Sequence, residues 1–131
     1  MDLNKAIEIA KSARLNSTHK NYFVGACLVT KSGNYYSGCN IDNMEIQSIC
    51  AERTAFVKAL SEGEREFSYI VVVGGHKDSS VLDDCKPCGY CRQFMVQFVD
   101  KDFKIYTCYG ENNKIDCYTI NDLLPNAFCF K

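Results

Sequence analysis

Residues 83–94, DDCKPCGYCRQF, carry three cysteines at spacings of three, with a proline between the first two. A Cys-x-x-Cys pair at the beginning of a helix places both thiols on one side, and such a pair commonly forms half of a zinc site. Pro87 favours a helix that starts beside it and keeps the preceding residue extended. We therefore expect Cys88 and Cys91 on the first helical turn and Cys85 in the loop that approaches it.

The helix that starts beside Pro87, expected to reach about Val99, is one of several elements that the hydrophobic pattern predicts. Apolar spacing and helix propensity predict two earlier helices, at residues 2–14 and 50–61, and a one-turn helix within 121–128. Segments rich in apolar and β-branched residues predict strands at 22–30, 35–39, 69–75, 103–109 and 115–120. The turn KSGN joins the first two strands as a hairpin. We expect an α/β fold in which a mixed sheet has helices on both faces.

Length and charge narrow the classes of protein. A chain of 131 residues is most simply a single domain over 1–131, large enough to bury a core without disulfides. The net charge is −1 and basic residues do not cluster, which argues against a nucleic-acid partner. The N-terminal stretch MDLNKAIEIAKSA lacks a continuous apolar run, so it predicts neither a signal peptide nor a membrane span. We expect a cytoplasmic protein.

The chain contains nine cysteines. An odd number without a secretory signal argues against a disulfide framework, and reduced cysteines either pack as small apolar residues or bind metal. Five lie in strand-like segments or lack a partner at ligand spacing, and we expect them to be packed: Cys27, Cys39, Cys108, Cys117 and Cys129. The remaining four are Cys50 and the group at 85, 88 and 91.

Cys50 opens the predicted helix at 50–61, and the strand before the Cys-x-x-Cys loop could bring the two helix starts side by side. Helix N-termini favour thiolates, the form that zinc requires. Cys50, Cys88 and Cys91 are therefore candidate zinc ligands. Two alternatives are open: a thioredoxin-like redox pair, or a closed structural site with Cys85 as the fourth ligand. Three ligands would instead leave a position for water and hence for chemistry.

Glu52 favours the open site. It stands two residues after Cys50, so it is near the metal but turned away from the ligand direction. A carboxylate there can accept a hydrogen bond from a water that the metal has made acidic, and can carry its proton. Three thiolates around Zn²⁺ leave a net charge of −1, and Arg53, next to Glu52, is the candidate cation outside the ligand set that compensates it.

The segments ICAERTAF (49–56) and KPCGYCRQF (86–94) together resemble the signature of the zinc-dependent nucleoside and base deaminases. With FVGACLVT, YYSGCNIDN and LLPNAF included, the chain resembles the small homotetrameric cytidine deaminases from about residue 5 to residue 128. The resemblance implies three α/β/α layers around a mixed five-stranded sheet, and one zinc per chain. It also implies that Glu52 shuttles protons while cytidine, and deoxycytidine, are hydrolytically deaminated for pyrimidine salvage.

The same resemblance implies contacts to a nucleoside substrate. Asn40 and Asp42 match positions that bind the ribose hydroxyls, and the backbone of Ala51 would meet the base. Tyr22 falls where the family usually has an aromatic residue beside the ligand. Phe128 matches an aromatic residue that enters the site of a neighbouring subunit, which implies a homotetramer with shared active sites.

Three departures from the family pattern concern the substrate. The ribose segment reads NIDN at 40–43 where Asn-x-Glu-Asn is usual, and the stretch between Asn40 and Cys50 is about one residue shorter and lacks its usual tyrosine. Tyr90 replaces a residue that is commonly small. A related family that deaminates blasticidin S shares the metal motifs and differs in this same loop. Deamination of another cytosine nucleoside is therefore the main alternative.

Overall fold

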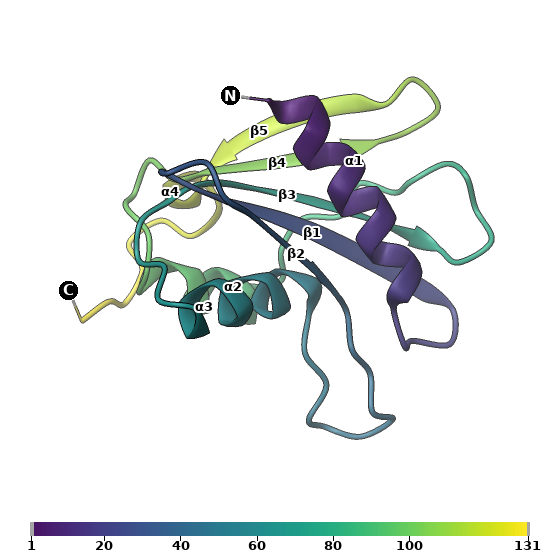
Figure 1. Cartoon of the computed structure of the whole chain (residues 1–131), viewed down its shortest axis with the longest axis horizontal. Helices are drawn as coiled ribbons and strands as arrows, with labels where there is room; N and C mark the ends of the chain where they lie inside the picture. Colours follow the sequence, from purple (N-terminus) through teal and green to yellow (C-terminus); the bar gives the residue numbers. More distant parts are fainter. Residues whose placement is uncertain (1, 131) are drawn as a thin grey trace.

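A computed structural model describes residues 2–130 as a five-stranded sheet with helices on both faces (Figure 1). The strand order is β2-β1-β3-β4-β5, with β3 and β4 parallel and the other neighbours antiparallel. The predicted α/β fold with a mixed five-stranded sheet is confirmed. The strands are β1 (Tyr22–Thr30), β2 (Tyr35–Cys39), β3 (Phe67–His76), β4 (Lys104–Tyr109) and β5 (Lys114–Thr119).

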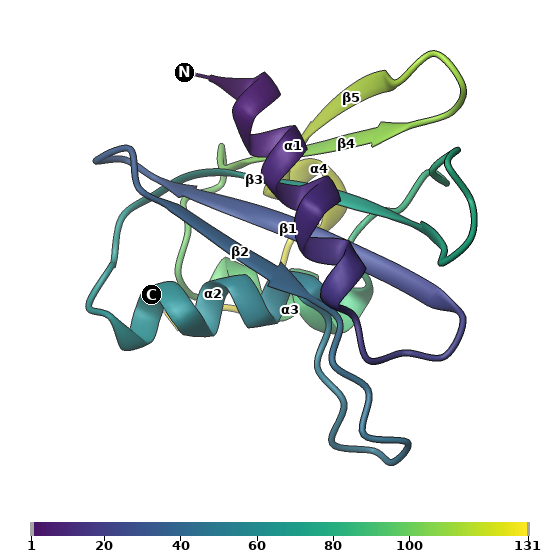
Figure 2. The same ribbon diagram turned by 45° about the vertical axis from the view of Figure 1, so that its right-hand side comes forward.

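The helix α1 (Leu3–Ala13), which continues into the short 3-10 helix η1 (Arg14–Asn16), covers one face of the sheet (Figure 2). Its first turn is capped by Asp2, whose side chain accepts a hydrogen bond from the Lys5 amide. Ala6, Ile7 and Ala10 are buried against the sheet. This burial of one helical stripe explains why the spacing of apolar residues predicted the helix.

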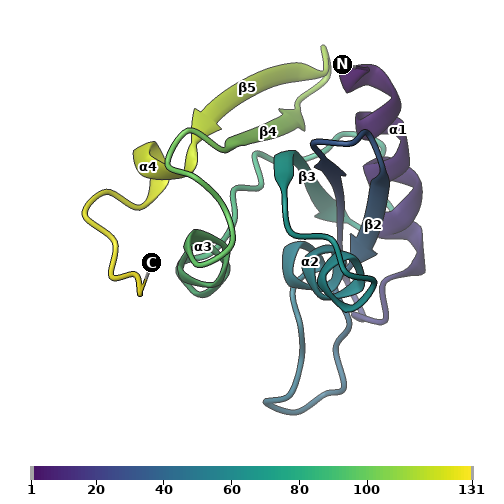
Figure 3. The ribbon, with the colours of Figure 1, turned by 60° about the vertical axis from the view of Figure 1, so that its left-hand side comes forward.

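Two helices cover the opposite face, α2 (Ala51–Ser61) and α3 (Gly89–Val96), while α4 (Ile120–Leu123) follows β5 (Figure 3). Their buried side chains share one core with the sheet. Gly38 of β2 allows α2 to approach closely, because a Cβ atom there would lie 2.5 Å from the Ala51 carbonyl oxygen. The N-terminus of α2 is thereby held against the end of β2.

The segment from 77 to 88 returns from the end of β3 to the start of α3. The Asp83 amide donates to the Gly74 carbonyl at 2.8 Å, and the two residues form an antiparallel bridge. Because Gly74 has no side chain, Cys85 packs directly over it: a Cβ atom on Gly74 would lie 2.8 Å from the Cys85 sulfur. This return brings the start of α3 beside the start of α2.

Several details differ from the sequence predictions. Pro87 precedes the N-cap residue Cys88, and α3 ends at Val96 rather than near Val99. The prediction of a packed Cys117 is wrong, because this residue is exposed on β5, an edge strand with one neighbouring strand only. Cys129 is only half-buried.

The expectation of a packed side chain is confirmed for Cys27, Cys39 and Cys108, which are all buried. Among residues 2–130, the helices are all too short or too polar to cross a membrane.

Candidate metal centre and active site

Three sulfur atoms meet where α2 and α3 begin. The Sγ atoms of Cys50, Cys88 and Cys91 all lie within 4.8 Å of one another, and those of Cys88 and Cys91 are 3.6 Å apart. Cys50 is the N-cap of α2 and Cys88 the N-cap of α3, both with extended backbone. Ligands placed tetrahedrally around zinc at its usual sulfur distance lie about 3.8 Å apart. The three thiols therefore fit a zinc ion.

The electrostatics of this cluster favour one thiolate, at Cys50. A hydrogen bond from the Cys91 thiol, assisted by Arg53, lowers the pKa of Cys50 to about 5, although burial opposes this. The same hydrogen bond and burial raise the pKa of Cys91, which keeps the shared proton. Arg53 donates from Nη2 toward the Cys50 sulfur at 3.9 Å. Because a metal ion must displace the retained proton, binding at this centre depends on pH.

Cys85 is placed differently from these three cysteines. In the part of the chain that the structure describes, the group of potential metal ligands contains Cys50, Cys88 and Cys91, and Cys85 lies outside it. Burial raises the pKa of the Cys85 thiol to about 12, and the side chain packs against Gly74 and the core. The geometry thus favours three protein ligands, the arrangement that leaves a zinc site open to water or substrate.

Glu52 is the second residue of α2 and is only 4% exposed. Burial raises the pKa of its carboxyl to about 7, and the negative charge of Cys50 contributes to the rise, whereas Arg53 opposes it. A carboxyl group with a pKa near neutrality can both accept and donate a proton at physiological pH. Glu52 is therefore chemically equipped for the proton transfer that the sequence assigned to it.

Asn40 and Asp42 stand at the base of the loop that joins β2 to α2. The side chain of Asn40 is hydrogen-bonded to the backbone of the neighbouring strand β1. Its Nδ2 donates to the Tyr22 carbonyl and its Oδ1 accepts from the Val24 amide, both at 2.9 Å. Asp42 organises the loop, because its Oδ1 accepts hydrogen bonds at 2.8 Å from the Met44 amide and the Ser48 hydroxyl. Both side chains are thus fixed in place by local hydrogen bonds.

The other predicted substrate contacts are placed as follows. The Tyr22 hydroxyl donates to Asp83 Oδ2 at 2.9 Å, so the ring is anchored to the segment that leads to α3. Ala51 is fully buried at the start of α2. Phe128 lies on the C-terminal segment, 68% exposed, with its ring edge-on to Phe130.

Two residues near the cysteines were not given a role from the sequence. Arg92 donates from Nε to the Pro87 carbonyl at 2.7 Å and from Nη1 to the Leu123 carbonyl at 2.8 Å, so it ties the start of α3 to the end of α4. Tyr90 was noted only for its size, yet its ring centroid lies 4.3 Å from the guanidinium carbon of Arg53. Both residues are direct neighbours of Cys91 in the sequence, and this was the signal that could have pointed to a role near the metal ligands.

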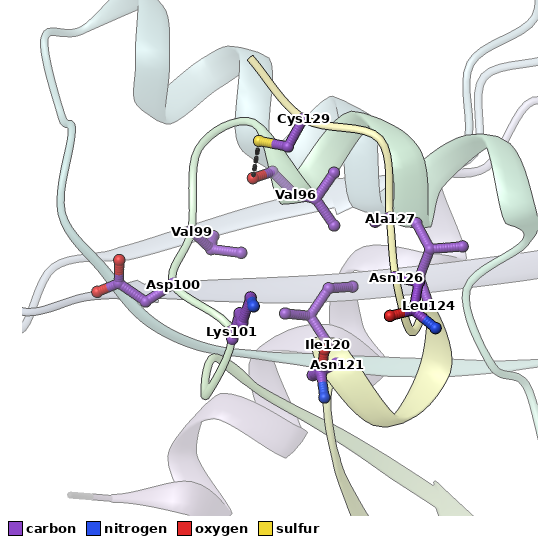
Figure 4. Close-up of a pocket in the computed structure, with 10 residues that line it drawn as sticks. All are labelled: Val96, Val99, Asp100, Lys101, Ile120, Asn121, Leu124, Asn126, Ala127 and Cys129. Carbon is purple, nitrogen blue, oxygen red and sulfur yellow. Dashed lines mark hydrogen bonds between the residues drawn. The ribbon is translucent and has the colours of Figure 1, made fainter. Parts of the chain in front are cut away.

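A cavity of about 370 Å³ lies elsewhere, between the end of α3, α4 and the C-terminal segment (Figure 4). None of its lining residues belongs to the predicted site, so this cavity does not mark the cysteine centre. The residues that line the cavity are Val96, Val99, Asp100, Lys101, Ile120, Asn121, Leu124, Asn126, Ala127 and Cys129.

Fold and site together define a class, the zinc-binding deaminases. Residues 2–107 match the family described as "Cytidine and deoxycytidylate deaminase zinc-binding region", and the chain belongs to this family. Zinc is thus the metal that fits the triad Cys50, Cys88 and Cys91.

Individual relatives point to the small type of cytidine deaminase. The chain is 37% identical to a cytidine deaminase of Sporosarcina psychrophila, over 98% of this chain and 92% of that protein. It is 38% identical to the cytidine deaminase of Halalkalibacterium halodurans, over 98% and 95%. The crystal structure of cytidine deaminase from Burkholderia pseudomallei superposes with a TM-score of 0.84 at 35% identity, over 98% of this chain and all of that one. The chain therefore resembles these proteins along almost its whole length.

Proposed function

We propose that this protein is a zinc-dependent hydrolase that deaminates cytidine, and deoxycytidine, to uridine and deoxyuridine with release of ammonia. The observation that carries the proposal is the buried carboxyl of Glu52, which interacts electrostatically with Cys50, one of three clustered cysteine sulfurs. The family match and the cytidine deaminases among its relatives support the choice of substrate. The protein then serves pyrimidine salvage in the cytoplasm, a reducing compartment in which its nine cysteines stay free of disulfides.

Cys50, Cys88 and Cys91 would hold zinc, which would act as a Lewis acid and make water acidic enough to be a nucleophile near neutral pH. In the overall reaction, the water oxygen bonds to C4 of the pyrimidine and the bond from C4 to the amino nitrogen breaks. One water proton ends on ring N3 and the other on the departing amine. Glu52 moves these protons, since its carboxyl accepts a proton at one step and donates it at the next.

Arg53 compensates the charge of the sulfur ligands. Three thiolates exceed the charge of one Zn²⁺ by one, and an uncompensated negative charge opposes the ionisation of water at the metal. The Arg53 guanidinium, 3.9 Å from the Cys50 sulfur, supplies a positive charge outside the ligand set. The N-termini of α2 and α3 add partial positive charge from their free amide groups.

The side chains of Asn40, Asp42 and Tyr22, together with the backbone of Ala51, orient the nucleoside. Asn40 and Asp42 bind the ribose hydroxyls, and their fixed orientation lowers the entropy cost of binding. Asp42 reaches less far than the glutamate that is usual there, so its contact to the ribose is either longer or runs through a bridging water. Tyr22, anchored by Asp83, packs beside the ligand.

A homotetramer completes the site. Phe128 is 68% exposed on a C-terminal segment, and we assign this ring to the active site of a neighbouring subunit. Phe128→Ala should then lower activity while zinc content remains that of the wild type. Sedimentation velocity should show an assembly of four chains; a monomer with full activity would refute the shared site.

A deamination assay over free bases, nucleosides and nucleotides tests the proposal. Loss of ultraviolet absorbance with cytidine and deoxycytidine, together with ammonia release, is the expected result. If another cytosine nucleoside such as blasticidin S is turned over faster than cytidine, that compound is the preferred substrate instead. No turnover of any cytosine compound by zinc-loaded protein would overturn the enzymatic role.

A further inference from the structure

A tyrosine stands between the two metal ligands of α3. Tyr90 follows Gly89 within the segment from Cys88 to Cys91, and its side chain is 71% exposed. An exposed aromatic side chain gains little from solvent exclusion, so burial alone does not account for its position. Its ring instead covers a charged group, with 4.3 Å between the ring centroid and the guanidinium carbon of Arg53.

Arg53 is in turn directed at the sulfur centre. Its Nη2 lies 3.9 Å from the Cys50 sulfur, and its Nε is buried without a hydrogen-bond partner. Its other hydrogen bonds go to the sulfurs of Cys50 and Cys91, which are weak acceptors, so hydrogen bonds alone hold the guanidinium weakly. The face of Tyr90 provides the further attraction, since cations bind over aromatic rings and guanidinium groups stack on them.

We propose that Tyr90 is a positioning residue that holds Arg53 against the sulfur ligands and thereby slows the loss of zinc. The tyrosine lies on the helix of Cys88 and Cys91, whereas Arg53 lies on the helix of Cys50, so the stacked pair also joins the two ligand-bearing helices. This role rests on the proposed zinc centre and concerns metal retention, not substrate.

Zinc release from the purified holoprotein into a chromogenic chelator tests the role, in four variants and the wild type. Tyr90→Leu keeps apolar bulk without an aromatic face and should release zinc about two- to fivefold faster, the range of an exposed cation–π contact. Tyr90→Phe keeps the face and should release zinc at the wild-type rate. Arg53→Gln should release zinc faster, and Tyr90→Leu added to Arg53→Gln should have no further effect.

Three results would overturn the role. One is that Tyr90→Leu releases zinc at the wild-type rate. Another is that Tyr90→Phe releases zinc as fast as Tyr90→Leu does. The third is an effect of Tyr90→Leu that persists in the Arg53→Gln background, because Tyr90 would then act independently of the arginine. Wild-type protein that purifies without zinc would overturn the metal centre as well, whereas zinc-loaded protein indifferent to residue 90 would overturn the stacking role alone.

Discussion

Replacing Glu52 by glutamine should lower the turnover rate and raise the folding stability of the metal-free protein. The substitution preserves the shape of the buried side chain but removes the group that carries protons, so kcat should fall by about 10²- to 10⁴-fold, the usual contribution of a general acid–base. The same carboxyl has its pKa raised from 4.5 to about 7, chiefly by burial. At about 1.4 kcal/mol per pKa unit, its ionised form costs the metal-free protein about 3 kcal/mol of folding free energy.

The sign of this cost determines how it varies with pH. Because the pKa of the folded state is the higher one, the penalty is absent below about pH 4.5, grows as the pH rises and is complete above about pH 7. Urea unfolding of metal-free protein, under reducing conditions, should therefore show that Glu52→Gln stabilises by about 3 kcal/mol at pH 8 and by much less at pH 5.

A matched control is Glu62→Gln, which makes the same charge change at the exposed C-cap of the same helix. It should alter neither turnover nor the pH dependence of stability. Full turnover by Glu52→Gln with bound zinc would refute the proton-transfer role. Equal stabilisation at pH 5 and pH 8 would refute the reasoning from burial.

Three further predictions concern packing and ligands. Cys91→Ala should lose zinc, whereas Cys85→Ala should retain the wild-type zinc content by elemental analysis. Loss of zinc from Cys85→Ala would indicate instead a closed site with four cysteine ligands. Gly74→Ala should destabilise by about 1–3 kcal/mol in thermal unfolding, because its Cβ would meet the Cys85 sulfur at 2.8 Å, and adding Cys85→Ala should recover part of this loss, since the Cβ of residue 85 would still lie 3.1 Å away. Arg14→Met should destabilise by at least about 3 kcal/mol, since its guanidinium donates to the carbonyls of residues 23, 75 and 76, and a change below 1 kcal/mol would contradict that account.

The ligand set could be predicted from sequence because its signals are local. Cys88 and Cys91 share one helical turn beside Pro87, and the start of α2 after Cys50 is evident from helix propensity. The strand that precedes the Cys-x-x-Cys loop then brings the two starts together. The continuous apolar run at 69–75 likewise predicted a strand, and the structure places that strand, β3, in the middle of the sheet, where both faces are covered.

Other features depend on contacts between distant segments, which a local pattern does not contain. The exposure of Cys117 follows from the edge position of β5, which is set by the strand order of the whole sheet. The Tyr22 hydrogen bond to Asp83 joins residues 61 positions apart. The stacking of Tyr90 on Arg53 arises only because α2 and α3 begin side by side.

The central claim is that three thiols hold a zinc ion with an open position beside a buried carboxyl group. Elemental analysis and a cytidine deamination assay on the same purified sample test it most directly. The account predicts about one zinc per chain, with conversion of cytidine to uridine that stops when a chelator strips the metal and returns when zinc is restored. Deamination that proceeds unchanged in fully zinc-free protein would contradict it.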